Sequence, residues 1–278
     1  IRYIEKIPNS CKNDLGIPDV RLLRPRTLII YDNFKKKFFY IINVYHDEKI
    51  SNYPKKFLNI KNELSNLFDQ SFNQKKFKEN KNNNKKINIK SNIQKNKFIA
   101  MVKKAKEYIK LGDIFQVVLS QRFEAKLTKK PLEIYKKLRI TNPSPFMFYF
   151  NFSDFQIIGA SPEILVRLRD NKITVRPIAG TRPRGKTIAQ DKFYEKDLLN
   201  DKKELSEHLM LLDLGRNDAG KVSMINTVKV TESFVIERYS HVMHIVSNVI
   251  GKYNKKFSKF KSLLAGFPAG TVSGAPKI

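Results

Sequence analysis

The chain has 278 residues, and its 54 Lys and Arg against 26 Asp and Glu give a formal net charge of +28. Its one cysteine, Cys11, excludes an internal disulfide and a cysteine metal cluster, so we expect a reducing compartment, the cytoplasm. No apolar run approaches the roughly 20 residues that span a bilayer, so we expect no membrane segment. Hydrophobic residues make up 41% of the chain, which is enough to bury a core.

The positive charge by itself would fit a protein that binds nucleic acid or an anionic surface. The excess is mostly lysine, accompanied by many Asn and Ile, and it is spread through the chain. No RNP sequence, zinc-finger spacing or basic heptad pattern is present. We therefore expect no nucleic-acid partner and attribute the charge to biased base composition of the source genome. A basic nucleic-acid binder stays as an alternative, and the salt dependence of binding would discriminate the two.

Composition divides the chain into three regions. In residues 1–72, apolar runs at 27–31 and 38–44 predict a hairpin, and helical spacing predicts a helix over 57–72. Residues 73–97 are almost all Lys, Asn and Gln with isolated Ile. Such a tract is too polar to bury a core, so we interpret it as an exposed linker. Residues 98–278 form the third region.

The third region combines helices and strands without regular βαβ alternation, which predicts an α+β fold. Helices are predicted over 97–111, over a short stretch from Pro131, and from Asp201 to near Gly215, and the first of them is expected to end at Gly112. Strands are predicted over 114–123, 146–152, 156–160, 164–169, 172–178, 228–236 and 240–251. Asp201 with Glu204 three residues later resembles a capping box. Residues 266–277 are predicted to form a Gly- and Pro-rich loop.

The stretch VRPIAGTRPRG, residues 175–185, contains a predicted Gly-Thr turn between two prolines. A ligand can approach the backbone closely at Gly180, which has no side chain. The amide and hydroxyl of Thr181, with Arg182 and Arg184 nearby, could form the wall of a carboxylate or phosphate pocket, because guanidinium groups pair with such anions. A solvated turn is the competing interpretation, and it is the commoner one for such a loop alone.

Glu204 and Glu207 lie one turn apart on a predicted helix and face the same way. Their mutual repulsion would be relieved by a divalent cation, although a solvated helix face is the commoner explanation of such a pair. His244 lies on a predicted strand, where a histidine is more often a satisfied core residue than a functional one.

Taken together, the motifs closely resemble those of the chorismate-utilising enzymes, and among them anthranilate synthase component I. The matching motifs are GDIFQVVLS (112–120), NPSPFMF (142–148), GASPE (159–163), PIAGTRPRG (177–185), DLGRND (213–218), ERYSHVMH (237–244) and SGAPK (273–277). They occur in order and cover residues 97–278, with a weaker likeness in the hairpin. The resemblance implies two mostly antiparallel β-sheets packed together, with helices on the outside.

The resemblance also implies a Mg²⁺-dependent reaction in which chorismate accepts ammonia, loses a hydroxyl and then eliminates pyruvate to give anthranilate. Glu207 matches a magnesium ligand of the family, a hard carboxylate that suits a hard cation. Glu204 would help to orient that ligand without binding the metal itself. Gly180 and Thr181 match the chorismate-binding turn.

Three further positions match catalytic residues of the family. Glu163 matches the carboxyl that protonates the departing hydroxyl, which requires a raised pKa, and His244 matches the histidine of pyruvate elimination. Relatives that add water carry a lysine base where Gln116 stands, so Gln116 favours ammonia as the nucleophile. Relatives that aminate at C4 carry a nucleophilic lysine where Ala179 stands. Aminodeoxychorismate synthase and an inactive chorismate-binding relative stay as alternatives.

The resemblance further implies a glutamine amidotransferase subunit as the source of ammonia. Pro145, Phe146 and Met147 match part of the site at which tryptophan inhibits, and residues 1–72 match the end of the regulatory region. The family pattern continues past residue 277 to a second magnesium glutamate and begins before residue 1. We therefore expect the 278 residues to be a piece lacking both termini and to have little activity alone.

Overall fold

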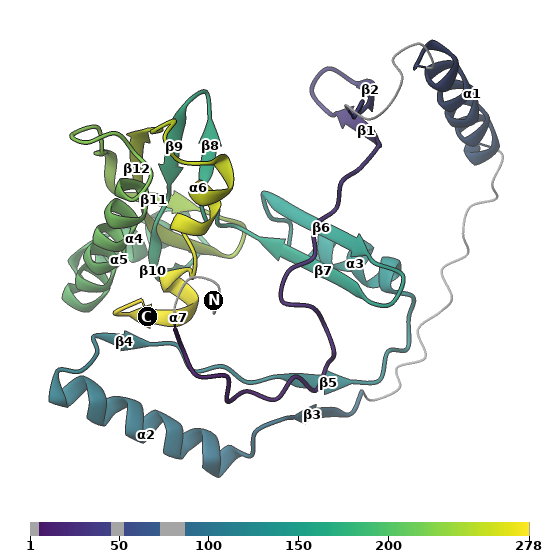
Figure 1. Cartoon of the computed structure of the whole chain (residues 1–278). Coiled ribbons are helices and arrows are strands. Elements are labelled where there is room, and N and C mark those ends of the chain that lie inside the picture. Colours follow the sequence, from purple (N-terminus) through teal and green to yellow (C-terminus); the bar gives the residue numbers. More distant parts are fainter. Residues whose placement is uncertain (1–5, 46–52, 73–86, 278) are drawn as a thin grey trace. The chain divides into compact units, whose positions relative to one another are not determined.

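The structure is a computed structural model that describes residues 6–45, 53–72 and 87–277 (Figure 1). Its backbone packs into two compact units, one of Asn9–Lys85 and the other of Lys86–Ile278 together with Ile1–Pro8. The division falls inside the tract that was expected to be a linker. Residues 73–86 of that tract lie outside the described residues, and the rest of it includes a short strand, β3 (Ile89–Ser91).

The smaller unit contains the expected hairpin and helix. Strands β1 (Thr27–Asp32) and β2 (Lys37–Ile42) pair antiparallel, and the Asp32 carboxylate accepts hydrogen bonds from the amides of Phe34 and Lys35 in the turn. Helix α1 (Tyr53–Phe72) begins four residues before the predicted start. The polar side chain at the end of the first strand therefore fixes the hairpin turn.

The larger unit is built around one long strand, β12 (Val242–Lys252). Strand β11 (Lys229–Arg238) pairs along one edge of β12, and β10 (Ile178–Pro183) and β9 (Lys172–Val175) pair along the other. Strand β8 (Arg167–Arg169) extends the sheet beyond β9. All of these pairings are antiparallel, and β12 contributes more buried side chains than any other strand of the sheet.

Helix α5 (Lys202–Gly220) packs against β9, β10 and β12. One core cluster lies under it, formed by Ile173, Val175, Leu212, Ala219, Val222, Val249, Tyr253 and Ala265. A second cluster joins Leu198 of α4 (Ile188–Asn200) to Met243 and Ile245 of β12. Burial of these apolar side chains fixes the orientation of α5, so that its first two turns face the end of β10.

Short strand pairs and helices complete the larger unit. Strand β3 pairs with β5 (Phe123–Ala125), β4 (Gln116–Val117) with β13 (Gly274–Ala275), and β6 (Phe146–Asn151) with β7 (Gln156–Ser161). The remaining helices are α2 (Lys95–Leu111), α3 (Pro131–Thr141), α6 (Lys259–Ala265) and α7 (Gly270–Ser273). The antiparallel α+β class is confirmed. Over the described ranges, no helix combines the length and the apolar character needed to cross a bilayer.

Three local expectations were wrong. The predicted strand over 114–123 is reduced to the two residues of β4 and the first residue of β5. Helix α5 does not end near Gly215 but continues to Gly220. Gly215 allows the helix to pack closely against Pro177, since a Cβ there would lie 3.1 Å from Pro177 Cγ. The predicted Gly-Thr turn is a strand, β10, interrupted by a bulge between Ala179 and Thr181.

Candidate active site

One cavity of about 410 Å³ collects most of the residues that the sequence singled out. Its lining is formed by Gln116, Pro162, Glu163, Ile178, Ala179, Gly180, Thr181, Glu204, Glu207, Leu211, His244 and Thr271. These side chains come from β4, the segment after β7, β10, α5, β12 and α7. Pro145, Phe146 and Met147 are not among the described lining residues; Phe146 and Met147 begin β6, where they pair with Ser161 and Ala160.

The bulge in β10 depends on Gly180. Its φ of +72° lies in the left-handed region, and a Cβ there would meet Ile245 Cδ1 at 3.1 Å and Glu204 Oε2 at 3.3 Å. A glycine satisfies both constraints because it has no Cβ. The bulge shifts the register of the strand, so that Thr181 stands opposite His244 of β12.

The hydrogen bonds of His244 determine which ring nitrogen carries the proton. Its Nδ1 lies 3.1 Å from the carbonyl oxygen of Gly180 and 3.0 Å from Thr181 Oγ1. Because a carbonyl oxygen only accepts, we assign the proton to Nδ1, which leaves Nε2 as a proton acceptor. The Tyr239 ring packs edge-on at 5.4 Å and holds the imidazole from the side.

Tyr239 is itself fixed by a polar network at the edge of the sheet. Its hydroxyl donates to Glu237 Oε2 at 2.8 Å, and Arg176 donates to the other oxygen of the same carboxylate. Burial, followed by this hydrogen bond, raises the pKa of Tyr239 to about 12. Tyr239 therefore stays neutral at physiological pH and acts as a packing partner of the histidine.

Glu163 lies two residues after the end of β7, where Ser161 Oγ donates to the Glu163 carbonyl at 3.2 Å and so fixes the backbone. Burial raises the pKa of the Glu163 carboxyl, and a hydrogen bond with the Thr271 side chain lowers it by a smaller amount. A carboxyl with a raised pKa is suited to donate a proton near neutral pH. Thr271 was not singled out from the sequence; it lies two residues before the SGAPK motif (273–277).

The first turns of α5 place two carboxylates beside the amide of Gln116. Asp201 caps the helix by accepting from the amides of Lys203 and Glu204, and the side chains of Glu204 and Glu207 line the cavity. Glu204 Oε1 also accepts from Arg182 at 3.5 Å. Gln116 Nε2 donates to Glu207 Oε1 at 3.1 Å. The other amide atom, Gln116 Oε1, is buried and has no hydrogen-bond partner among the described residues.

These oxygen atoms suit Mg²⁺ in kind, because Mg²⁺ prefers carboxylate, carbonyl and water oxygens. Glu207 is the carboxylate best placed to hold the ion, and the orphaned Gln116 Oε1 is a further oxygen beside it. The described residues contain no group of three or more His, Cys, Asp or Glu side chains able to hold a metal. Water or other donors would therefore complete the coordination of an ion bound here.

The two arginines of the 175–185 stretch do not line the cavity, which overturns their predicted role in an anion pocket. Arg182 donates to Asp197 at 2.5 Å and to Asp201 at 2.8 Å, and Arg184 donates to both oxygens of Asp191. These carboxylates neutralise both guanidinium groups and connect β10 to α4 and α5. The arginines are therefore structural in this arrangement.

His208, also on α5, was assigned no role from the sequence and is fully buried. Its Nε2 lies 2.7 Å from Ser247 Oγ of β12, and its ring packs edge-on against Phe234. Burial lowers the pKa of His208 to about 4, so the ring is neutral at physiological pH. It lies next to Glu207 in the chain and locks this turn of the helix onto the sheet.

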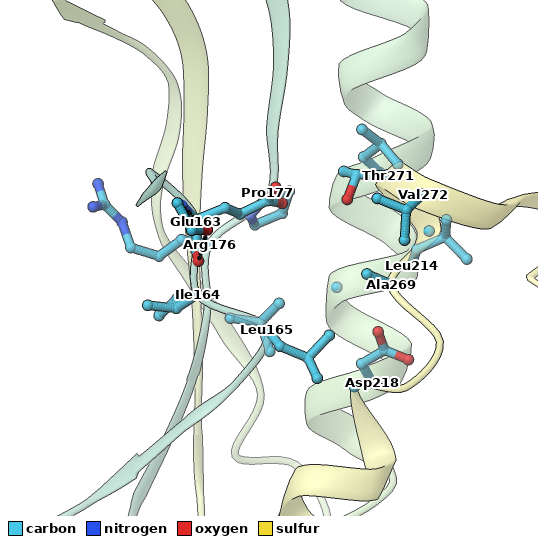
Figure 2. A pocket seen from close by; sticks show the side chains of 16 residues that line it. Glu163, Ile164, Leu165, Arg176, Pro177, Leu214, Asp218, Ala269, Thr271 and Val272 are labelled. Carbon is cyan, nitrogen blue, oxygen red and sulfur yellow. Dashed lines mark hydrogen bonds between the residues drawn. The ribbon is translucent and has the colours of Figure 1, made fainter. Parts of the chain in front are cut away.

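A second cavity of about 210 Å³ adjoins the first and shares Glu163, Leu211 and Thr271 with it. In Figure 2, Glu163, Ile164, Leu165 and Arg176 form one wall, and Leu214, Asp218, Thr271 and Val272 face them. Glu163 therefore stands between two cavities. The wall opposite it is made jointly by α5 and the segment that follows Gly266.

Comparison with known proteins identifies the family of the chain. The sequence pattern of the family described as chorismate binding enzyme matches residues 1–278. Anthranilate synthase component 1 of Cereibacter sphaeroides is 50% identical over 281 residues, which cover 100% of this chain and 56% of that protein. Anthranilate synthase component 1 of Acetivibrio thermocellus is 43% identical over 289 residues and covers 100% of this chain.

The fold agrees as well. The crystal structure of anthranilate synthase component I from Streptococcus pneumoniae TIGR4 superposes with a TM-score of 0.77 at 37% identity, over 91% of this chain and 55% of that one. The chain thus spans about half the length of the relatives it matches. On the matching family pattern and this identity along its whole length, the chain belongs to the family of chorismate binding enzymes.

Proposed function

We propose that the natural protein is the large subunit of an anthranilate synthase, a lyase that converts chorismate and ammonia to anthranilate and pyruvate. The observation that carries this proposal is the single cavity in which Glu163, Gln116, Glu207 and His244 meet around the Gly180 bulge. These four side chains come from four separate parts of the chain, and each has a chemistry that the reaction needs. The component 1 relatives support the same proposal.

In the proposed reaction, Gly180 and Thr181 bind the substrate at the bulge, where both residues line the cavity. Glu163, whose carboxyl pKa is raised by burial, donates a proton to the departing hydroxyl. His244 accepts a proton at Nε2 during pyruvate elimination, because its Nδ1 is committed to the Gly180 carbonyl. Bound Mg²⁺, held through Glu207 with Glu204 behind it, would supply positive charge for the substrate carboxylate.

Two residues distinguish this reaction from those of related enzymes. Gln116 is an amide hydrogen-bonded to Glu207 and cannot take a proton from water, so ammonia is the nucleophile. Ala179 is buried in β10 and has no nucleophilic atom, which argues against the covalent route to a C4 amine. Aminodeoxychorismate synthase activity, which makes a C4 amine, thus ranks second to anthranilate synthase activity. Identification of the product separates the two candidates.

We propose a glutamine amidotransferase subunit as the source of ammonia, consistent with the component 1 names of the relatives. Tryptophan inhibition is proposed to involve Pro145, Phe146 and Met147. Phe146 and Met147 begin β6 and Pro145 directly precedes it. Because β6 pairs with the strand leading to Glu163, it provides a physical link between that segment and the catalytic acid.

The test is the appearance of anthranilate fluorescence from chorismate, Mg²⁺ and ammonium in the natural protein and in its Glu163→Gln variant. Loss of a general acid costs about 10²- to 10⁴-fold in rate, so the variant should lose at least the lower figure in kcat. Glu107→Gln, on the exposed face of α2, is the matched control and should keep the full rate. Wild-type turnover in Glu163→Gln would refute the assigned role, and a product aminated at C4 would favour the second candidate.

A further inference from the structure

The segment from Gly266 to Lys277 is a loop closed at its base by one side chain. Lys277 Nζ donates to the carbonyl oxygen of Gly266 at 2.9 Å and to Asp218 Oδ2 at 2.6 Å. The side chains of Lys277 and Asp218 are 9% and 10% exposed. One buried ammonium group therefore joins both ends of the loop to helix α5.

The closed loop holds two parts of the candidate active site. Strand β13 of the loop pairs with β4, where the amides of Phe115 and Val118 donate to the carbonyl oxygens of Ala275 and Ser273 at 2.8 and 2.9 Å. Gln116 lies between these two hydrogen bonds. At its other side the loop carries α7, whose Thr271 lines both cavities together with Glu163.

The anchor lies on the same helix as the carboxylates of the site. Asp218 and Glu207 both belong to α5, and Glu207 receives the hydrogen bond from Gln116 Nε2. The connections thus form a ring from α5 through Lys277 and the loop to Gln116, and back to α5. Figure 2 shows Asp218 on α5 with Thr271 and Val272 of the loop on the same side of the cavity, opposite Glu163.

A second lysine reaches the same carboxylate but cannot take over this task. Lys221 Nζ lies 3.3 Å from Asp218 Oδ1, but its side chain is 55% exposed. Lys221 directly follows α5 in the chain, so its contact with Asp218 ties that helix to its own end and not to the loop. Neither Asp218 nor Lys277 lines the cavity that holds Gln116 and Glu207.

We propose that Asp218 and Lys277 are a positioning pair that fixes the loop and thereby sets Gln116 against Glu207 and Thr271 against Glu163. Removing the lysine charge leaves the buried Asp218 carboxylate with only the exposed Lys221 as a partner and breaks the bond to Gly266, so the loop is released from α5. The consequence for turnover rests on the proposed function. The consequence for the loop itself does not.

The test compares Lys277→Met with Lys221→Met. The second variant also removes a lysine ammonium beside the Asp218 carboxylate, but it does not affect the loop. Amide hydrogen exchange at Phe115 and Val118 should become at least about tenfold faster in Lys277→Met, because local opening exposes these groups. Lys221→Met should match the wild-type protein. The kcat for anthranilate should fall by about tenfold in Lys277→Met, since misplaced catalytic groups slow the chemical step. The KM for chorismate should change by less than about threefold.

A third variant separates positioning from stability. The double substitution Asp218→Leu with Lys277→Met replaces the pair by apolar side chains, which preserves folding in comparable buried pairs. We expect wild-type melting with exchange at Phe115 and Val118 still about tenfold faster, because the bond to Gly266 is gone. If these two amides exchange at the wild-type rate in the folded double variant, the proposal is overturned. This outcome decides the proposal even if Lys277→Met does not fold. If the wild-type protein makes no anthranilate, the proposed function fails, and the exchange data still decide the role of the pair.

Discussion

At the scale of single residues, the choice of nucleophile depends on Gln116. Its Nε2 donates to Glu207 and its Oε1 is buried without a described partner, so the amide contacts the site without offering a base. A lysine at this position would place an amine beside the Glu207 carboxylate. That carboxylate would favour the charged ammonium form, so the amine would act as a base only at higher pH.

We therefore predict that Gln116→Lys diverts product from anthranilate towards isochorismate, and that the diverted fraction rises with pH. Chromatography of the products formed from chorismate and Mg²⁺, with and without ammonium, measures this fraction. Gln121→Lys, on an exposed position five residues away, is the matched control and should leave the products unchanged. Identical products from Gln116→Lys and the wild-type protein would count against the argument from the amide.

The residue-level site could be predicted only in part. Glu204 and Glu207 share a helix face, and the spacing in the sequence shows this directly. The contact between Gln116 and Glu207 joins positions 91 residues apart, which no local pattern reports. Arg182 and Arg184 were misassigned because their carboxylate partners lie on α4 and at the start of α5, and the pairing depends on how these helices pack.

At the scale of elements, two signals at helix ends were confirmed, whereas Gly215, expected to end α5, lies inside that helix. Gly112 ends α2 in the left-handed conformation and Asp201 caps α5, as expected from their residue types. Helix α4 was not predicted, because only Asp191 and Leu198 are buried along it and no apolar stripe marks the helical period. The bulge in β10 was interpreted as a turn because proline and glycine mark both structures.

Helix α4 is held at its start by Asp191, which joins three elements. Its carboxylate accepts from Arg184 at the end of β10, from the amide of Gly185 and from Arg238 at the end of β11. The hydrogen bonds from Arg184, followed by that from the Gly185 amide, lower the pKa of Asp191 from 3.8 to about 2. Because the folded protein binds this proton less readily than the unfolded chain, the stabilisation is complete above about pH 4 and is lost as the pH falls towards 2.

We predict that Asp191→Asn lowers the free energy of unfolding at pH 6 and that the difference from the wild-type protein shrinks as the pH falls towards about 2.5. Urea unfolding of both proteins at the two pH values measures the difference. Asp213→Asn is the control, since Asp213 is 64% exposed and pairs with Arg216 on the surface of α5. A stability difference for Asp191→Asn that is the same at both pH values would contradict the assigned linkage.

At the scale of the whole molecule, the net charge of +28 has a physical consequence that is independent of the reaction. Like charges repel one another in the compact state and destabilise it. Exposed ion pairs act in the opposite direction, but each contributes only about 0–1 kcal/mol. With roughly two basic residues for each acidic one, repulsion should exceed attraction among the surface charges.

Added salt should therefore stabilise this protein. Between about 0.01 M and about 0.1 M salt the Debye length shortens from about 30 Å to about 10 Å, which screens the long-range repulsion more than the short ion pairs. We predict that the Tm rises with NaCl over this range and rises equally with KCl. A variant with Lys103, Lys106 and Lys110 changed to Glu, all on exposed positions of α2, should show a smaller rise because its net charge is lower. A Tm that falls with salt would instead mean that the ion pairs around Arg182 and Arg184 outweigh the repulsion of the whole chain.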